Sequence, residues 1–149
     1  MTQRPLADIV SFTGTQDGMT SPQRWRVISL LAETNAREFH HGDCVGADEE
    51  ASGLAKAEHY KVHVHPASDV APRKRAHSYA DHVHEAKPAL KRNTDLATVC
   101  TVLIATPKEY EEVVRSGTWS TIRRAKKLKR EIYIVFPDGS YSHHNARPL

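Results

Sequence analysis

Five short segments rich in β-branched and aromatic residues recur along the chain, and long helical patterns separate most of them. The segments are residues 8–14, 37–42, 61–66, 101–107 and 131–137. Most of them end at Gly or Pro, which is typical of strands that lead into turns. Strands that alternate with helices predict an α/β fold with a mainly parallel sheet of about five strands. The near-continuous apolar run 102–105 indicates that helices cover both faces of this sheet.

Four helices are predicted between the strands. The first begins at Ser21-Pro22, with Ser21 as the N-cap and Pro22 in the first turn. The others are predicted over 46–59, 87–100 and 118–130. Segment 67–86 is polar and weakly periodic, and an irregular segment of that length is usually functional or disordered. We therefore expect it to close over a ligand, with Arg73, Lys74 or Arg75 reaching the phosphates. The alternative is a solvated charged loop.

Composition places the chain among soluble globular proteins. Hydrophobic residues make up 39% and charged residues 26% of its 149 residues, which suits a single domain spanning 1–149 with a partly ordered tail over 140–149. The chain has no apolar run of about 18 residues or more and no apolar signal region at the N-terminus, so we expect a cytoplasmic protein without membrane contact. Cys44 and Cys100 are expected to be free thiols in that compartment.

The loop after the first strand is the first of three candidate binding loops, because ligands of parallel α/β sheets bind at the carboxyl ends of the strands. In residues 13–20, Gly14 allows the backbone to approach a ligand closely, and Thr13 and Thr15 offer hydroxyl groups. The alternative is an ordinary connection between a strand and a helix.

The second candidate loop is residues 40–48, after the second strand. Gly42 and Gly46 permit tight turns, and the following helix directs free N–H groups at the loop. Asp43 and Asp48 suit a sugar hydroxyl or a base N–H better than a phosphate. The alternative for Asp48 is that it only favours the start of the helix.

The third candidate loop is Ser116-Gly117-Thr118, three small residues at the start of the fourth helix. Free N–H groups, two hydroxyls and the positive end of the helix dipole would together bind a phosphate. The alternative is plain N-capping by Ser116 or Thr118. The net charge of +3 is compatible with an anionic ligand.

The histidines and cysteines raise two further alternatives, a metal site and nucleophilic catalysis. Of the ten histidines, His63 and His65 share one face of a strand, but no spacing matches a known ligand set, so we predict no metal and no cofactor. Cys44 beside His41 offers a nucleophile with a base, although adjacency in sequence does not establish their geometry.

Three motifs in this order resemble the SLOG superfamily: "FTGT…GMT", "HHGDCVGADEEA" and "RNTDLATVCTVLIATP…SGTWSTIRRAKKLKREIYIVFPDG". The superfamily includes the DNA-processing protein DprA (Smf) and the LOG-type lysine-decarboxylase-like nucleotide phosphoribohydrolases. The resemblance spans about residues 9–139 and is greatest to short stand-alone members from bacteria and their phages. It implies a Rossmann-like three-layer domain that binds a nucleotide, and often a homodimer.

The resemblance also implies roles for particular residues. Gly14 and Thr15 would line the first loop; Gly42, Gly46 and Asp48 would form the second. Arg92 and Asn93 resemble an Arg-Asn pair before the fourth strand, and residues 116–118 would bind phosphate. LOG-type enzymes carry a catalytic Glu in a PGGxGTxxE pattern. Here Thr121 stands at that place and the PGG is absent.

The function that these features favour is binding of a phosphorylated nucleotide or nucleotide-derived small molecule. One alternative is a nucleotide N-glycosidase with relocated acid-base groups, for which Asp43, Asp48 and Glu85 are the candidate carboxylates. Another is single-stranded DNA binding as in DprA, although an aromatic content of 7% offers few stacking platforms.

Overall fold

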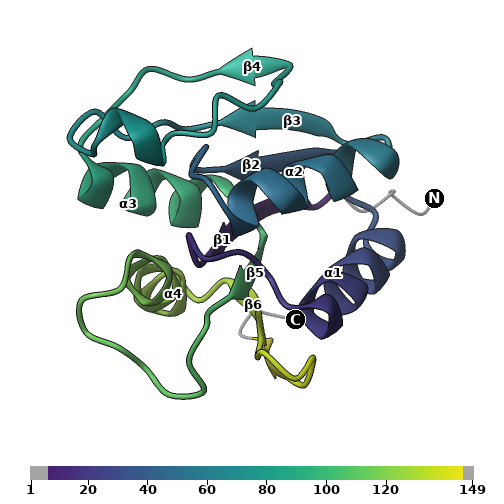
Figure 1. Ribbon diagram of the computed structural model, residues 1–149. Helices are drawn as coiled ribbons and strands as arrows, with labels where there is room; N and C mark the ends of the chain where they lie inside the picture. The colour runs from purple at the N-terminus through teal and green to yellow at the C-terminus, as the bar shows by residue number, and fades with distance from the viewer. Residues whose placement is uncertain (1–6, 146–149) are drawn as a thin grey trace.

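A seven-stranded sheet forms the centre of the computed structural model, which describes residues 7–145 (Figure 1). Its strand order is β4-β3-β2-β1-β5-β6-β7, and only β7 runs antiparallel to its neighbour. The strands are β1 (Ile9–Gly14), β2 (Glu38–His41), β3 (Lys61–Val64), β4 (His82–Val83), β5 (Val102–Thr106), β6 (Glu131–Val135) and β7 (Tyr141–His144). All five predicted strands are therefore present, and β4 and β7 are additional.

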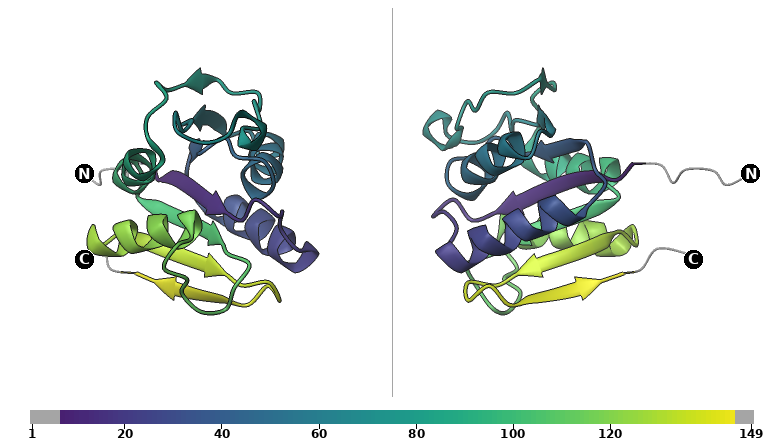
Figure 2. Two further views of the ribbon diagram at one scale, coloured as in Figure 1. Left: turned by 60° about the vertical axis from the view of Figure 1, so that its left-hand side comes forward. Right: turned by 90° about the vertical axis from the view of Figure 1, so that its right-hand side faces the viewer.

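Helices cover both faces of the sheet (Figure 2). They are α1 (Ser21–Glu33), α2 (Ala47–Ala57), α3 (Ala89–Val99) and α4 (Gly117–Lys127). One hydrophobic cluster joins α1 and α2 to Phe12 of β1, and a second joins α3 and α4 to Leu103 of β5. Alternation along β1 divides the two faces: Phe12 points toward α1 and α2, whereas the hydroxyl of Ser11 donates to the Leu96 carbonyl of α3 over 2.8 Å. The predicted three-layer α/β class is confirmed.

Helix α1 begins one residue earlier than expected, because Thr20 rather than Ser21 is its N-cap. The Thr20 hydroxyl accepts from the Gln23 N–H, and the Gln23 amide oxygen accepts from the Thr20 N–H, which completes a capping box. The Gln23 Nε2 also donates to the Pro107 carbonyl over 2.8 Å. This buried amide therefore ties α1 to the loop that follows β5.

Segment 67–86 contains more regular structure than predicted. It holds a 3-10 turn at Pro72–Lys74 and strand β4, which pairs in parallel with β3. The N–H of Val62 donates to the Asp81 carboxylate over 2.9 Å, which fixes the entry to β4. In the tail, β7 pairs with β6, while residues 146–149 lie outside the described part of the chain.

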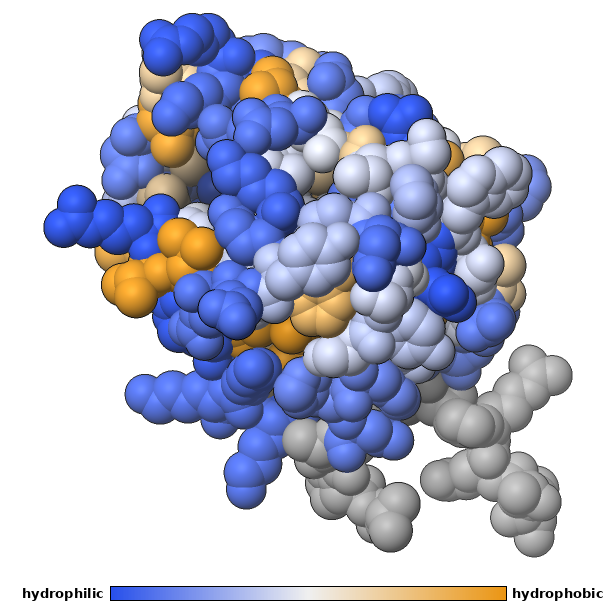
Figure 3. Space-filling model, turned by 60° about the horizontal axis from the view of Figure 1, so that its bottom comes forward, coloured by the Kyte–Doolittle hydropathy of each residue, from blue (hydrophilic) through white to orange (hydrophobic). Residues whose placement is uncertain are grey.

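The chain reverses its direction of travel across the sheet after β4. It builds β1 to β4 toward one edge and then returns to place β5 on the other side of β1. The loops after β1 and β5 diverge at this switch point, where α/β sheets bind ligands. Across residues 7–145, no helix has the length and apolarity needed to cross a membrane. One face of the molecule shows mainly hydrophilic residues with scattered hydrophobic patches (Figure 3).

Candidate functional site

A cleft of about 390 Å³ opens at the switch point, between the loops that follow β1, β2 and β5. It brings together ten of the twelve residues predicted to bind a ligand. These are Thr13, Gly14, Thr15, Gly42, Asp48, Arg92, Asn93, Ser116, Gly117 and Thr118. The other two, Asp43 and Gly46, lie beside the cleft but do not line it.

Close packing of the first loop against the start of α2 explains two glycines. A Cβ on Gly14 would lie 2.5 Å from the Ala47 Cβ, which no side chain tolerates. Gly46 has a φ of +88°, and a Cβ there would lie 2.3 Å from the Gln16 carbonyl oxygen. The Ala47 N–H donates to the Thr15 carbonyl over 3.0 Å, so the two loops form one wall of the cleft.

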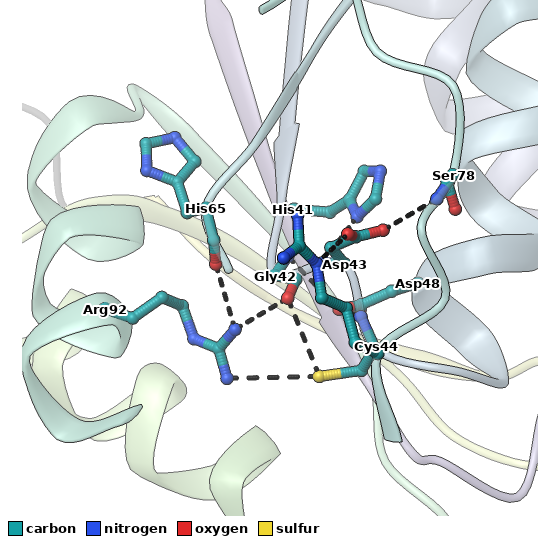
Figure 4. A network of polar contacts seen from close by, with 9 residues as sticks. His41, Gly42, Asp43, Cys44, Asp48, His65, Ser78 and Arg92 are labelled. Atoms are coloured by element: carbon teal, nitrogen blue, oxygen red, sulfur yellow. Dashed lines mark hydrogen bonds and ion pairs between the residues drawn. The ribbon is translucent and has the colours of Figure 1, made fainter. Parts of the chain in front are cut away.

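Arg92 of α3 fixes the floor of the cleft (Figure 4). Its side chain is buried, and its Nη1 donates to the carbonyls of Gly42 over 2.7 Å and His65 over 3.0 Å. Its Nε donates to the side-chain oxygen of Asn93 over 2.9 Å. Its Nη2 has a weaker contact, 3.9 Å to the Cys44 sulfur. Arg92 therefore holds the second loop in place and keeps Nη2 available to a ligand.

Asp48 is a buried carboxyl group in the wall of the cleft, at the first turn of α2. Its Oδ2 accepts from the N–H groups of Gly42 over 3.1 Å and Cys44 over 3.2 Å. Its Oδ1 is buried without a hydrogen-bond partner among the described residues. Burial raises the pKa of Asp48 to about 6, against the stabilising charge of Arg92. An unpartnered buried oxygen in a cleft is suited to accept a hydrogen bond from a ligand.

Asp43 contacts other parts of the chain and not the cleft. Its carboxylate accepts from the Arg75 Nε over 3.0 Å and from the Ser78 N–H over 3.0 Å (Figure 4), and Asp43 does not line the cleft. This ion pair ties the second loop to segment 67–86. Arg75 is therefore engaged with Asp43, and neither it nor Arg73 or Lys74 lines the cleft.

The amino end of α4 forms the opposite side of the cleft. The Ser116 hydroxyl accepts from the Trp119 N–H over 3.3 Å, so Ser116 caps the helix, as the alternative interpretation had it. The N–H groups of Gly117 and Thr118 precede the helical hydrogen-bond ladder and are directed beyond its end. A Cβ on Gly117 would meet nothing within 4 Å, so open space lies beside this turn.

Several lining residues escaped prediction from sequence. They are Gln16, Asp17, Cys44, Leu96, Lys108, Glu109, Val113 and Arg115. Arg115 directly precedes the N-cap of α4 and adds positive charge there, whereas Lys108 forms an ion pair with Asp17 over 3.0 Å. Both residues could have been identified from their position between the fourth predicted strand and the fourth predicted helix, at the edge of the sheet where ligands were predicted to bind.

Three residues considered for catalysis, Cys44, Glu85 and Thr121, do not have the surroundings that catalysis in the cleft would require. Burial raises the pKa of the Cys44 thiol to about 11, so it is protonated at neutral pH and is a poor nucleophile. Glu85 borders a second cavity with His65 and His84. Thr121 is fully buried, and its hydroxyl donates to the Gly117 carbonyl within α4. Among the predicted catalytic carboxylates, only Asp48 lines the cleft.

Outside the cleft, the structure groups histidines that no spacing in the sequence indicates. His40, His63 and His84 come from three neighbouring strand segments, and each offers a potential ligand atom within 4.8 Å of the others. Burial lowers the pKa of His40 to about 4 and that of nearby His65 to about 3, so both are neutral at pH 7.

Comparison with known proteins supports the fold. No protein-family model matches the chain, and no curated protein matches it. The chain is similar to a solved structure described as the molybdenum cofactor binding protein from the phototrophic bacterium Rippkaea orientalis. The TM-score is 0.64 at 19% sequence identity, and the match covers 88% of this chain and 77% of that chain. At this identity the likeness establishes a shared α/β fold alone, and the SLOG resemblance stays a prediction.

Proposed function

We propose that the protein binds a phosphorylated nucleotide or nucleotide-derived small molecule in the cleft at the switch point. The observation that carries the proposal is that one cleft contains both a positively charged end and a buried carboxyl group. The amino end of α4, directly preceded by Arg115, supplies positive potential, while the wall of the cleft contains the Asp48 carboxyl, whose buried Oδ1 has no partner among the described residues. A ligand with a phosphate and a separate hydroxyl or N–H donor satisfies both.

The two sides of the cleft favour one orientation of that ligand. Three acidic residues in the first turn of α2 repel a phosphate, whereas the first turn of α4 contains none. The phosphate therefore lies at Gly117 and Thr118, where the free N–H groups and helix dipole stabilise it. The sugar or base then lies toward Asp48, with Arg92 Nη2 beside it.

The structural neighbour supports ligand binding in a general sense. That protein is described as binding a molybdenum cofactor, and it shares the α/β fold. Because function resides in sites and not in folds, the likeness does not specify the ligand of this chain. The identity of the ligand depends on the residues of the cleft.

The experiment that tests the proposal is a Gly117→Asp substitution with a matched control. Titration calorimetry with AMP, GMP, CMP, UMP and inorganic phosphate is expected to detect binding of at least one nucleotide to the unmodified protein. Gly117→Asp adds a negative charge where the phosphate would bind but enters open space, and Asp is favourable at a helix start. We expect binding to disappear while the thermal transition is retained.

Gly53→Asp is the control, because Gly53 lies exposed in α2 and a Cβ there also meets nothing within 4 Å. It should bind nucleotide as the unmodified protein does. Unchanged affinity in folded Gly117→Asp would place the ligand elsewhere.

A second candidate function, N-glycosidic cleavage, is favoured by one observation: the carboxyl of Asp48 has a pKa of about 6, which suits an acid-base group. Against it, the residue at the position of the LOG-type Glu is Thr121, which is uncharged and buried within α4. We therefore expect no rapid release of free base from purine monophosphates, measured by chromatography. Rapid release that stops in Asp48→Asn would establish the enzyme instead.

Single-stranded DNA binding has less support. The basic run that begins at Arg123 is partly engaged within the chain: Arg123 pairs with Glu112, and Arg124 donates to the Thr94 hydroxyl. A nucleic-acid interface would show affinity that falls steeply with salt and grows with strand length. Comparing AMP with an oligonucleotide at two salt concentrations separates the two functions.

A further inference from the structure

Five histidines gather on one face of the β2–β4 half of the sheet. His40 pairs in register with His63, and His63 pairs with His82, so these three side chains stand in one row across the strands. His65 and His84 each follow two residues later and therefore point to the same side. The opposite side of the same strands is apolar, with Phe39, Val62 and Val64 in the core.

The imidazole rings form two close pairs that stack on each other. The Nδ1 of His40 lies 2.8 Å from the Nε2 of His65, and the Nδ1 of His63 lies 3.0 Å from the Nε2 of His84. The rings of His40 and His63 stack with centroids 4.2 Å apart, and those of His65 and His84 stack at 4.1 Å. Nitrogen atoms of four rings therefore converge on a small volume.

Glu38 is placed to orient two of these rings. Its Oε1 lies 2.9 Å from the Nε2 of His40 and 3.4 Å from the Nε2 of His63. A carboxylate at this position holds a proton on each Nε2 and leaves each Nδ1 with a lone pair, which faces the Nε2 of His65 or of His84. Carboxylates that orient the far nitrogen of a histidine in this way are characteristic partners of metal-bound imidazoles.

We propose that His40, His63 and His84 bind a divalent late-transition-metal ion of the Zn²⁺ class, with Glu38 orienting the first two rings. Their potential ligand atoms lie within 4.8 Å of one another. Ligands bound tetrahedrally at about 2.0–2.1 Å from Zn²⁺ are about 3.4 Å apart, so small ring movements bring them into place. Three imidazoles suit Zn²⁺, Ni²⁺ or Cu²⁺ and not Mg²⁺ or Ca²⁺, which prefer oxygen.

The surroundings fit an ion that enters from solvent. A second cavity of about 500 Å³ is lined by His65 and His84, so the cluster is accessible although His40 is buried. None of the five histidines lines the proposed nucleotide cleft, and Arg92 separates the two sites because it lines both cavities. It joins β2 and β3 to the end of β4, a strand of two residues. A bound ion would therefore secure segment 67–86 to the sheet.

The test is zinc binding by the full chain without an affinity tag of histidines. Protein treated with chelator is titrated with ZnCl₂ by calorimetry, and the metal content after dialysis is measured by mass spectrometry. We expect one ion per chain and a thermal transition that rises with zinc concentration, because the ion binds only the folded state. Co²⁺ in place of Zn²⁺ should give d–d absorption of a tetrahedral or five-coordinate site.

Paired double variants identify the ligands. His63→Gln with His84→Gln is expected to weaken zinc binding at least about 100-fold, and Glu38→Gln about 10- to 100-fold. His143→Gln with His144→Gln removes as many histidines from β7, outside the cluster, and should leave affinity unchanged. If the first pair unfolds the protein, His84→Gln alone, at the sheet edge, takes its place. Binding of less than one ion per chain, or equal losses in the two double variants, would overturn the proposal.

Discussion

Replacing Asp48 by Asn should make the unliganded protein more stable at neutral pH and at the same time weaken ligand binding. The carboxyl of Asp48 is buried, and one of its oxygens lacks a partner among the described residues. An Asn side chain has the same shape, and its Oδ1 can accept from the N–H groups of Gly42 and Cys44. The substitution therefore removes a buried negative charge and keeps the loop geometry.

The pKa of Asp48 sets the size and sign of the effect. It rises from 3.8 to about 6 on folding, so the two values differ by about 2, and each pKa unit corresponds to about 1.4 kcal/mol. The folded protein binds this proton more tightly than the unfolded chain does. The wild-type free energy of unfolding therefore falls by about 3 kcal/mol as pH rises from below 3.8 to above 6. The Asn variant has no such dependence at this position.

Urea denaturation of both proteins between about pH 3.5 and pH 8 measures the difference directly. We expect similar stabilities at the acidic end and an advantage of up to about 3 kcal/mol for Asp48→Asn at the alkaline end. Glu49→Gln, an exposed change in the same helical turn, should change the free energy of unfolding only slightly. A wild-type protein that is more stable than Asp48→Asn at pH 8 would refute the reasoning, because it would mean that Arg92 holds Asp48 ionised at a net gain.

Gly46→Ala should destabilise the fold by about 1–3 kcal/mol in urea, because φ is +88° and the new Cβ would meet the Gln16 carbonyl. Gly53→Ala, in open space within α2, should instead stabilise it by about 0.5–1 kcal/mol, and equal losses in both variants would contradict this argument. Arg92→Met leaves the two carbonyls that Arg92 contacts without that donor, so we expect a loss of about 1–3 kcal/mol together with weaker nucleotide binding by calorimetry. Retained affinity in a folded Arg92→Met protein would exclude a ligand contact by Arg92.

The fold could be predicted from the sequence because the central strands of the sheet have the most distinctive sequence patterns. Strands β1 and β5 are largely buried on both faces. The continuous apolar run of β5 and the β-branched and aromatic residues of β1 identify them without knowledge of their neighbours. Strands β4 and β7 lie at the edges and carry polar residues such as His82 and Ser142. Their pairing depends on contacts with β3 and β6, which no local pattern shows.

The candidate site could be assembled from sequence for a topological reason. The carboxyl ends of parallel strands meet at one edge, so the loops after β1, β2 and β5 converge whatever their exact length. The direction in which each side chain points could not be predicted in this way. Asp43 and Asp48 stand five residues apart in one loop, yet one faces Arg75 and the other the cleft. Asp43 also adopts a φ of +57°, a left-handed conformation that is uncommon outside glycine and that no pattern in the sequence indicates.

The histidine cluster depends on sheet register, which is the least predictable property of a strand. Alternation places His63 and His65 on one face of β3, but says nothing about which residues of β2 and β4 stand beside them. A shift of one residue in the pairing of β2 with β3 would set Phe39 or His41 opposite His63. The side chain of His40 would then no longer lie beside that of His63 on the same face of the sheet. The observed register, with His40 beside His63, keeps Phe39 in the core and directs the imidazoles together. Burial of Phe39 and Val62 on the α1–α2 side is therefore what selects the geometry of the proposed metal site on the other side.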